Sequence, residues 1–265
     1  MALKLIKHDF KNTWLEITIV CSAIIAFSFI FGVAIKLETR SYFFTIMAVL
    51  TLGLLYIAAV AIVIINIVRS IHKKLFSDEG YLTLTLPVSI DQLLISKVLV
   101  NFVWICMTFI TFLLSILIIG ATVGDFMFTD MLSFIYEQPL MVILGTVFAS
   151  VEAIVFIITL VLVLGLLNTG RIKKFKLLCG IIFYYLIVNV LSWVKALVRI
   201  IPYAIMNGQN GIEIVKTPNF YNFYLGPLIT NNSFLDLNNL LFNLIAIVGF
   251  YFLSRYIIKN KLELE

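Results

Sequence analysis

The chain has 265 residues, of which 62% are hydrophobic and 12% charged, with a mean hydropathy of +1.12 and a formal net charge of +5. A soluble domain is about 45–50% apolar and about 25% charged, so this composition excludes a soluble globular domain, and a disordered chain would show the opposite balance. Three cysteines are too few for a disulfide scaffold. A membrane protein with several spans remains.

Six segments of the chain are long and apolar enough to cross about 30 Å of hydrocarbon as helices. We therefore expect an all-α, polytopic membrane protein with a single transmembrane domain over residues 1–265. The expected spans are about 15–35, 42–68, 98–124, 139–170, 177–198 and 237–256. The expected connecting parts are an interfacial helix at 1–14, a cytoplasmic coupling loop at 69–97 and an outer segment at 199–236.

The distribution of basic residues predicts the orientation of these spans. With both termini in the cytoplasm, the inside segments contain 14 of the 19 Lys and Arg residues, and the outside segments contain five. We therefore expect a multi-pass protein with both termini cytoplasmic. Because the cations are spread over four short segments, we expect contact with membrane lipid and no nucleic-acid partner.

The first 14 residues are typical of an amphipathic helix. Apolar side chains recur at helical spacing at Leu3, Ile6, Phe10 and Trp14. Lys4, Lys7, His8 and Lys11 fill the opposite face. This pattern predicts a basic helix that lies on the cytoplasmic membrane surface and anchors the chain there.

The loop between the second and third spans is too long for a turn and too short for a domain. Ser89 lies three residues before Gln92, ahead of an apolar run, which is a capping-box signal for a helix that begins near Ile90. Residues 77–79 suit the first turn of another short helix. The apolar stretch 81–86 either packs against the protein's own helices or docks a cytosolic partner.

The outer segment at 199–236 looks more structured than a plain loop. Pro202 should end the helix of the fifth span, and the turn-like residues 207–211 follow. An aromatic cluster at 220–224 suits the membrane interface. We expect short re-entrant or interfacial helices in this segment.

Charged residues at three positions are candidates for a pathway or gate. Glu152 is the only acid inside a long apolar run, and a carboxylate within the membrane is a functional hypothesis by default. It is either a proton site, cation contact or gate, or a hydrogen-bonded group that ties helices together. Lys195 and Arg199, four residues apart, either bind lipid head groups or line the outer mouth of a pathway.

Motifs for catalysis are missing from the sequence. It contains no G-x-x-x-x-G-K-[ST] phosphate loop, no H-E-x-x-H zinc motif and no G-x-S-x-G nucleophile elbow. We therefore expect that the chain by itself is not an enzyme and that it binds no cofactor or metal.

The stretch Phe76–Pro87, which reads FSDEGYLTLTLP and continues to Leu94-Ile95-Ser96-Lys97, resembles the permease subunits of ABC-2 type ATP-binding-cassette transporters. The similarity is greatest to the bacterial branch of Gram-positive exporters and antimicrobial-peptide resistance systems. It extends to the whole plan of an amphipathic N-terminal helix, six spans, a long second loop and an extended outer segment.

This resemblance implies that a coupling helix in the second loop docks on a separate cytosolic ATPase subunit, which would hold ATP and Mg. The implied docking residues are Phe76, Asp78, Glu79, Gly80, Tyr81, Leu82, Thr83 and Leu86. The chain would be half of an exporter in the bacterial cell membrane and would pair with a second permease, identical or paralogous. Its substrate would be an amphipathic peptide, drug or lipid-like molecule.

Two other classes of function stay open at this point. The first is an ATP-independent secondary transporter or channel, in which Glu152 would be the proton or ion site. The second is a membrane sensor or assembly scaffold that binds a partner and transports nothing.

Overall fold

The structure is a computed structural model that describes residues 2–36, 42–75, 89–123, 133, 136, 139–169, 175–198, 203–207, 211–215, 232–235 and 237–260. The chain divides into two compact units. The first comprises Met1–Tyr136 with Glu263–Glu265, and the second comprises Glu137–Leu262. Each unit is built around three long helices among the described residues.

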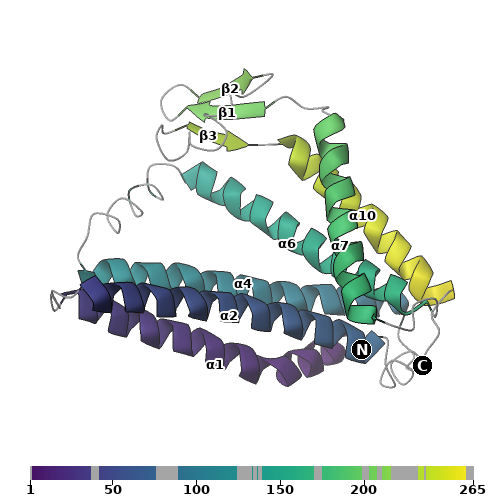
Figure 1. Ribbon diagram of the computed structural model, residues 1–265. Helices are drawn as coiled ribbons and strands as arrows, with labels where there is room; N and C mark the ends of the chain where they lie inside the picture. The colour runs from purple at the N-terminus through teal and green to yellow at the C-terminus, as the bar shows by residue number, and fades with distance from the viewer. Residues whose placement is uncertain are drawn as a thin grey trace. The chain divides into compact units, whose positions relative to one another are not determined.

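The first unit contains α1 (Ala2–Lys36), α2 (Tyr42–Leu75) and α4 (Ile90–Val123), which lie side by side in Figure 1. α1 packs more extensively along α4 than along α2. At a rise of 1.5 Å per residue each helix is about 50 Å long, which exceeds the hydrocarbon thickness of about 30 Å. Each helix is therefore long enough to extend beyond the apolar layer of a membrane.

α1 and α4 approach closely near the end of α1. A Cβ atom added to Gly32 would lie 1.8 Å from Thr122 Oγ1 and 2.8 Å from Thr122 Cβ, distances that no real contact allows. Further along the same pair, Ile17, Val100 and Trp104 form a buried apolar cluster. The absence of a side chain at Gly32 thus lets the two helix backbones approach, as small residues do between membrane helices.

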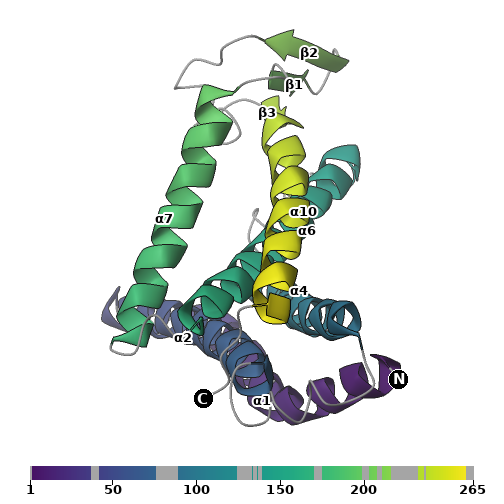
Figure 2. The same cartoon turned by 90° about the vertical axis from the view of Figure 1, so that its right-hand side faces the viewer.

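The second unit contains α6 (Pro139–Leu167), α7 (Lys176–Leu197) and α10 (Leu237–Asn260). α6 packs mainly against α10 and to a lesser extent against α7. Figure 2 shows α7 and α10 as separate helices, with α6 crossing behind α10. Few contacts join α7 directly to α10, so the polar contacts described below are an important part of that junction.

A small antiparallel sheet lies between α7 and α10 in the chain. It contains β1 (Tyr203–Asn207), β2 (Gly211–Val215) and β3 (Asn232–Leu235) in the order β2-β1-β3. β1 and β2 form a hairpin in which Asn207 pairs with Gly211.

This sheet corrects the expectation of short helices in the predicted outer segment, whereas the six predicted spans are helical as expected. β-branched residues, which favour strands, recur in β2 at Ile212, Ile214 and Val215. The Asn- and Gly-rich stretch 207–211 falls between two paired strands, and such sequences are common in hairpins. Residues 199–202, 208–210, 216–231 and 236 lie outside the described residues.

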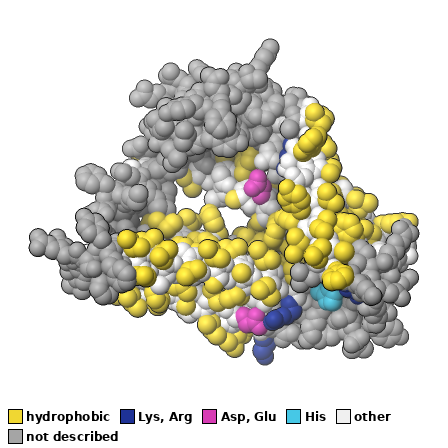
Figure 3. All heavy atoms as spheres, in the orientation of Figure 1, with side chains coloured by type: hydrophobic (Ala, Val, Ile, Leu, Met, Phe, Trp, Pro, Cys, Tyr) yellow, Lys and Arg dark blue, Asp and Glu magenta, His cyan; other side chains and the backbone are white. Residues whose placement is uncertain are grey.

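Among the described residues, six helices are long and apolar enough to cross a membrane, which agrees with the expected number of spans. Their apolar windows are Thr13–Lys36, Val49–His72, Ile90–Thr122, Val142–Leu167, Leu178–Lys195 and Asn238–Asn260. Figure 3 shows hydrophobic side chains over most of the described helical surface on that face. A surface of this kind suits contact with lipid. The cytoplasmic location of both termini stays a prediction.

Two helix starts bear on the predicted loops. α1 continues through Trp14 without a break, so the predicted interfacial segment and the first span form one helix, and its place at the membrane surface stays a prediction. α4 begins at Ile90, as the capping-box signal predicted. The Gln92 backbone N–H donates to Ser89 Oγ at 3.3 Å, which satisfies one of the free donors at the helix start.

Candidate functional site

A cluster of charged and amide side chains joins the three long helices of the second unit. Glu152 lies in the first half of α6, and Lys195 lies in the last turn of α7, where a cation complements the helix dipole. Asn238, Asn239 and Asn243 lie in the first two turns of α10. All five side chains belong to helices that are otherwise strongly apolar.

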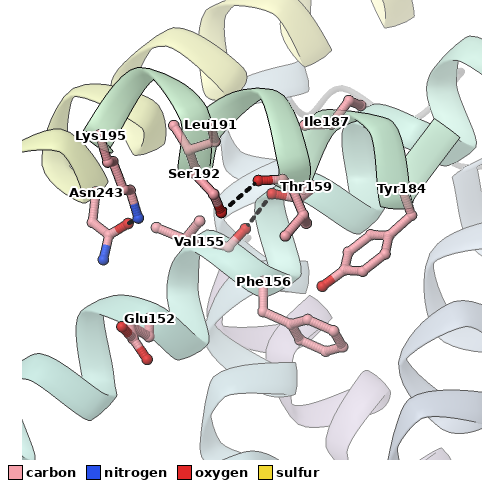
Figure 4. A pocket seen from close by; sticks show the side chains of 11 residues that line it. Glu152, Val155, Phe156, Thr159, Tyr184, Ile187, Leu191, Ser192, Lys195 and Asn243 are labelled. Carbon is pink, nitrogen blue, oxygen red and sulfur yellow. Dashed lines mark hydrogen bonds between the residues drawn. The ribbon is translucent and has the colours of Figure 1, made fainter. Parts of the chain in front are cut away.

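Asn239 connects the two charged residues. Its Nδ2 donates to Glu152 Oε1 at 3.2 Å, and its Oδ1 accepts from Lys195 Nζ at 2.7 Å. Lys195 Nζ also donates to Asn243 Oδ1 at 2.6 Å (Figure 4). Each donor and acceptor in this network is therefore used in the direction that its chemistry requires. The network brings a negative and a positive group into one site through a neutral amide.

Asn238 supports the same junction between α7 and α10. Its side chain is almost fully buried, with 1% exposed, and Nδ2 donates to the backbone oxygens of Lys195 and Val198, each at 3.4 Å. These carbonyls belong to the end of α7, where the helix itself supplies no donor. Asn238 thus holds the turn that carries Lys195 against the start of α10.

A pocket of about 160 Å³ lies beside this network, between α6 and α7 with Asn243 of α10 at one end. Figure 4 shows Glu152, Lys195 and Asn243 together at one end of the pocket and the rings of Phe156 and Tyr184 at the other. Val155, Thr159, Ile187, Val188, Leu191 and Ser192 complete the lining. The pocket is therefore amphipathic along its length.

The aromatic end of the pocket is formed by one pair of rings. Phe156 and Tyr184 make an edge-to-face contact with centroids 6.0 Å apart and an interplanar angle of 82°. The hydroxyls of Thr159 and Ser192 donate to backbone oxygens of their own helices, at 2.7 and 2.9 Å. These hydroxyls are thereby engaged within their own helices, so the wall between the two ends is mainly apolar.

The structure brings together two of the three charged residues that sequence analysis singled out. Glu152 was considered a lone carboxylate among the spans, but it shares a pocket with Lys195 and accepts a hydrogen bond from Asn239. This contact fits the alternative in which Glu152 ties helices together, and its exposure to the pocket leaves the pathway alternative open. Arg199 lies outside the described residues.

The implied ATPase-docking residues also lie outside the described residues. This holds for Phe76, Asp78, Glu79, Gly80, Tyr81, Leu82, Thr83 and Leu86. The described chain ends before them at Leu75 and resumes at Ser89.

Sequence analysis missed the amides of α10. Asn239 and Asn243 are spaced four residues apart, which places them on one face of a helix. Amide side chains are costly in a membrane-spanning helix unless they are hydrogen-bonded, so this spacing is a usable signal for an interhelical polar contact.

A second polar contact lies at the other end of the chain, within the first unit. Asp9 of α1 and Lys97 of α4 form a salt bridge in which the side chains are only 3% and 1% exposed. Phe10 stacks on Trp104 beside it, with centroids 4.4 Å apart. The pair ties the N-terminal part of α1 to the first turns of α4, at the last residue of the predicted coupling loop 69–97.

Among the described residues no group of His, Cys, Asp or Glu is arranged to hold a metal ion. Cys21, Cys106 and Cys179 are free thiols. No family model, no curated protein and no solved structure matches the chain.

Proposed function

We propose that the chain is the membrane-spanning permease subunit of an ATP-binding-cassette exporter in the bacterial cell membrane. The observation that carries the proposal is the sequence FSDEGYLTLTLP, which follows directly on α2 and precedes the start of α4. Six helices long and apolar enough to cross a membrane are consistent with one half of such an exporter.

In this proposal the loop between α2 and α4 docks on a cytosolic ATPase subunit that holds ATP and Mg. Closure of the ATPase subunits would push on the loop and shift the spans between inward-facing and outward-facing states. Such a push shifts the equilibrium only if the docked loop contacts the ATPase differently in the two states. Asp9 and Lys97 support this role, because their buried contact fixes α1 to the helix that the loop enters.

The proposal includes a second permease copy or a paralogue, since one half supplies only part of a translocation pathway. α7 is consistent with such a partner or with lipid. No residue of its apolar window from Leu178 to Lys195 is fully buried within this chain, and Ile181, Tyr185 and Trp193 are each more than 60% exposed. Extended apolar surfaces of this size are normally covered by protein or membrane.

The test compares ATP hydrolysis and substrate export in the reconstituted complex. The purified chain alone should hydrolyse no ATP, and adding its ATPase subunit should give activity that the permease stimulates. Glu79→Ala and Gly80→Pro should each uncouple ATP hydrolysis from export. Glu137→Ala, in the segment between α4 and α6, is the control and should leave coupling unchanged. Normal binding and export by both loop variants would overturn the docking assignment.

An ATP-independent transporter or channel is the second candidate. The observation in its favour is a carboxylate, Glu152, that faces a pocket within strongly apolar helices. The purified chain in vesicles should then show flux driven by an ion gradient alone, and Glu152→Gln should abolish that flux. A chain that binds a partner and gives no flux under any energy source would instead be a sensor or scaffold.

A further inference from the structure

We infer that the pocket between α6 and α7 binds the zwitterionic head group of a small amphiphile, with an ammonium beside Glu152 and a phosphate or carboxylate beside Lys195. This inference rests on the described residues of α6, α7 and α10 alone. It stands whether or not an ATPase drives the chain.

The first reason for a zwitterionic ligand is the pair of opposite charges in the pocket. Glu152 and Lys195 line the same end of the pocket and are linked through one amide, Asn239. A ligand with a single charge would gain attraction from one of these groups and repulsion from the other. A head group that carries both charges a few bonds apart complements both. The amide links also fix the positions of the charged groups before a ligand arrives, which lowers the cost of binding.

The second reason concerns the size of the ligand, which the volume of the pocket limits. Sites for drug-sized ligands enclose about 300–1,000 Å³. The 160 Å³ of this pocket is closer to a cavity of about 150 Å³ that holds one benzene molecule. The pocket therefore accommodates a head group with a short part of its tail, and it is too small for a folded peptide or a large drug.

The third reason is that the lining of the pocket changes from charged to apolar along α7, which suits an amphiphile. From Lys195 to Tyr184 the pocket follows α7 for eleven residues, which is about 16 Å along the helix axis. Over this length the lining changes from charged to aliphatic and ends at the rings of Phe156 and Tyr184 (Figure 4). A single alkyl chain that leaves the head group along this wall would remain in apolar contact.

The experiment compares three ligands that share a hexyl tail: hexylphosphocholine, hexyltrimethylammonium and hexyl phosphate. The full chain is kept in neutral maltoside micelles, and Kd is measured by ligand-observed NMR with empty micelles subtracted. We expect hexylphosphocholine to bind about tenfold more tightly than either singly charged ligand, which corresponds to about 1.4 kcal/mol.

Two conservative variants separate the charges. Glu152→Gln, which keeps an acceptor for Asn239, should weaken hexylphosphocholine about tenfold and leave hexyl phosphate no weaker. Lys195→Gln should weaken hexylphosphocholine by a similar factor and leave hexyltrimethylammonium no weaker. Glu16→Gln and Lys259→Gln, which change exposed charges outside the pocket, are the controls and should change no Kd.

A third variant tests the place of binding without changing a charge. Ser192→Phe places a ring in the pocket. Ser192 is exposed and its hydroxyl donates to the backbone oxygen of Val188 in the same helix, so the fold should tolerate the change. It should abolish binding of all three ligands. Equal Kd values for the three head groups, tighter binding of the cation than of the zwitterion, or unchanged binding in Ser192→Phe would each overturn the inference. The wild-type ranking and Ser192→Phe decide the question even if a charge variant fails to fold.

Discussion

Breaking the buried contact between Asp9 and Lys97 should strongly destabilise the first unit. Both side chains are at least 97% buried, so removal of either partner leaves a charge in an environment that solvates it poorly. Loss of one partner of a buried pair costs about 3–5 kcal/mol. A typical domain is stable by about 5–15 kcal/mol, so Lys97→Met should remove a large share of the stability.

The assay is denaturant unfolding in neutral detergent, followed by tryptophan fluorescence in a chain whose Trp14 and Trp193 are replaced by Phe, so that the signal comes from Trp104, which stacks on Phe10 beside the pair. Asp9→Leu and Lys97→Met should each lower the free energy of unfolding by about 3–5 kcal/mol, and the double variant should lose much less than the sum. Arg69→Met is the matched control. Its ion pair with Glu16 is more than half exposed on both sides and should contribute about 1 kcal/mol or less. Equal losses of stability in Lys97→Met and Arg69→Met would show that burial does not make the Asp9–Lys97 pair more important than an exposed ion pair.

Two further changes test the packing and the start of α4. Gly32→Ala should lower the stability by about 1–3 kcal/mol, because the new methyl group collides with Thr122, and adding Thr122→Gly should restore most of the loss in the same unfolding assay. Ser89→Ala removes the acceptor of the Gln92 N–H and should lower the free energy of unfolding by about 1 kcal/mol. Ser192→Ala is the control and should change it by no more than about 0.5 kcal/mol. Equal effects of the two serine variants would contradict the capping role of Ser89.

The sequence was sufficient for features that depend on local pattern. Uncharged runs predicted six membrane-capable helices, and the spacing of Ser89 and Gln92 predicted the start of α4 at Ile90. Both predictions rest on the length of an apolar segment or on a contact within one helical turn. Such features are determined by neighbours in the chain.

Contacts between distant segments were not predictable from one sequence. Asp9 and Lys97 are 88 residues apart, and in the sequence each looks like a solvated charge in a basic segment. Glu152 and Asn239 are 87 residues apart, so the amide that links Glu152 to Lys195 could not be assigned. The small sheet of β1, β2 and β3 was missed for a different reason, since short apolar runs give little to distinguish a strand from a helix.

The most direct test of the proposed function is photo-crosslinking in intact cell membranes, with a crosslinking amino acid in place of Glu79. We expect the captured protein to be an ATPase with a G-x-x-x-x-G-K-[ST] phosphate loop. The same crosslinker in place of Glu137 is the control and should capture no ATPase. Capture of no ATP-binding protein from position 79, or equal capture from position 137, would show that residue 79 does not dock on an ATPase.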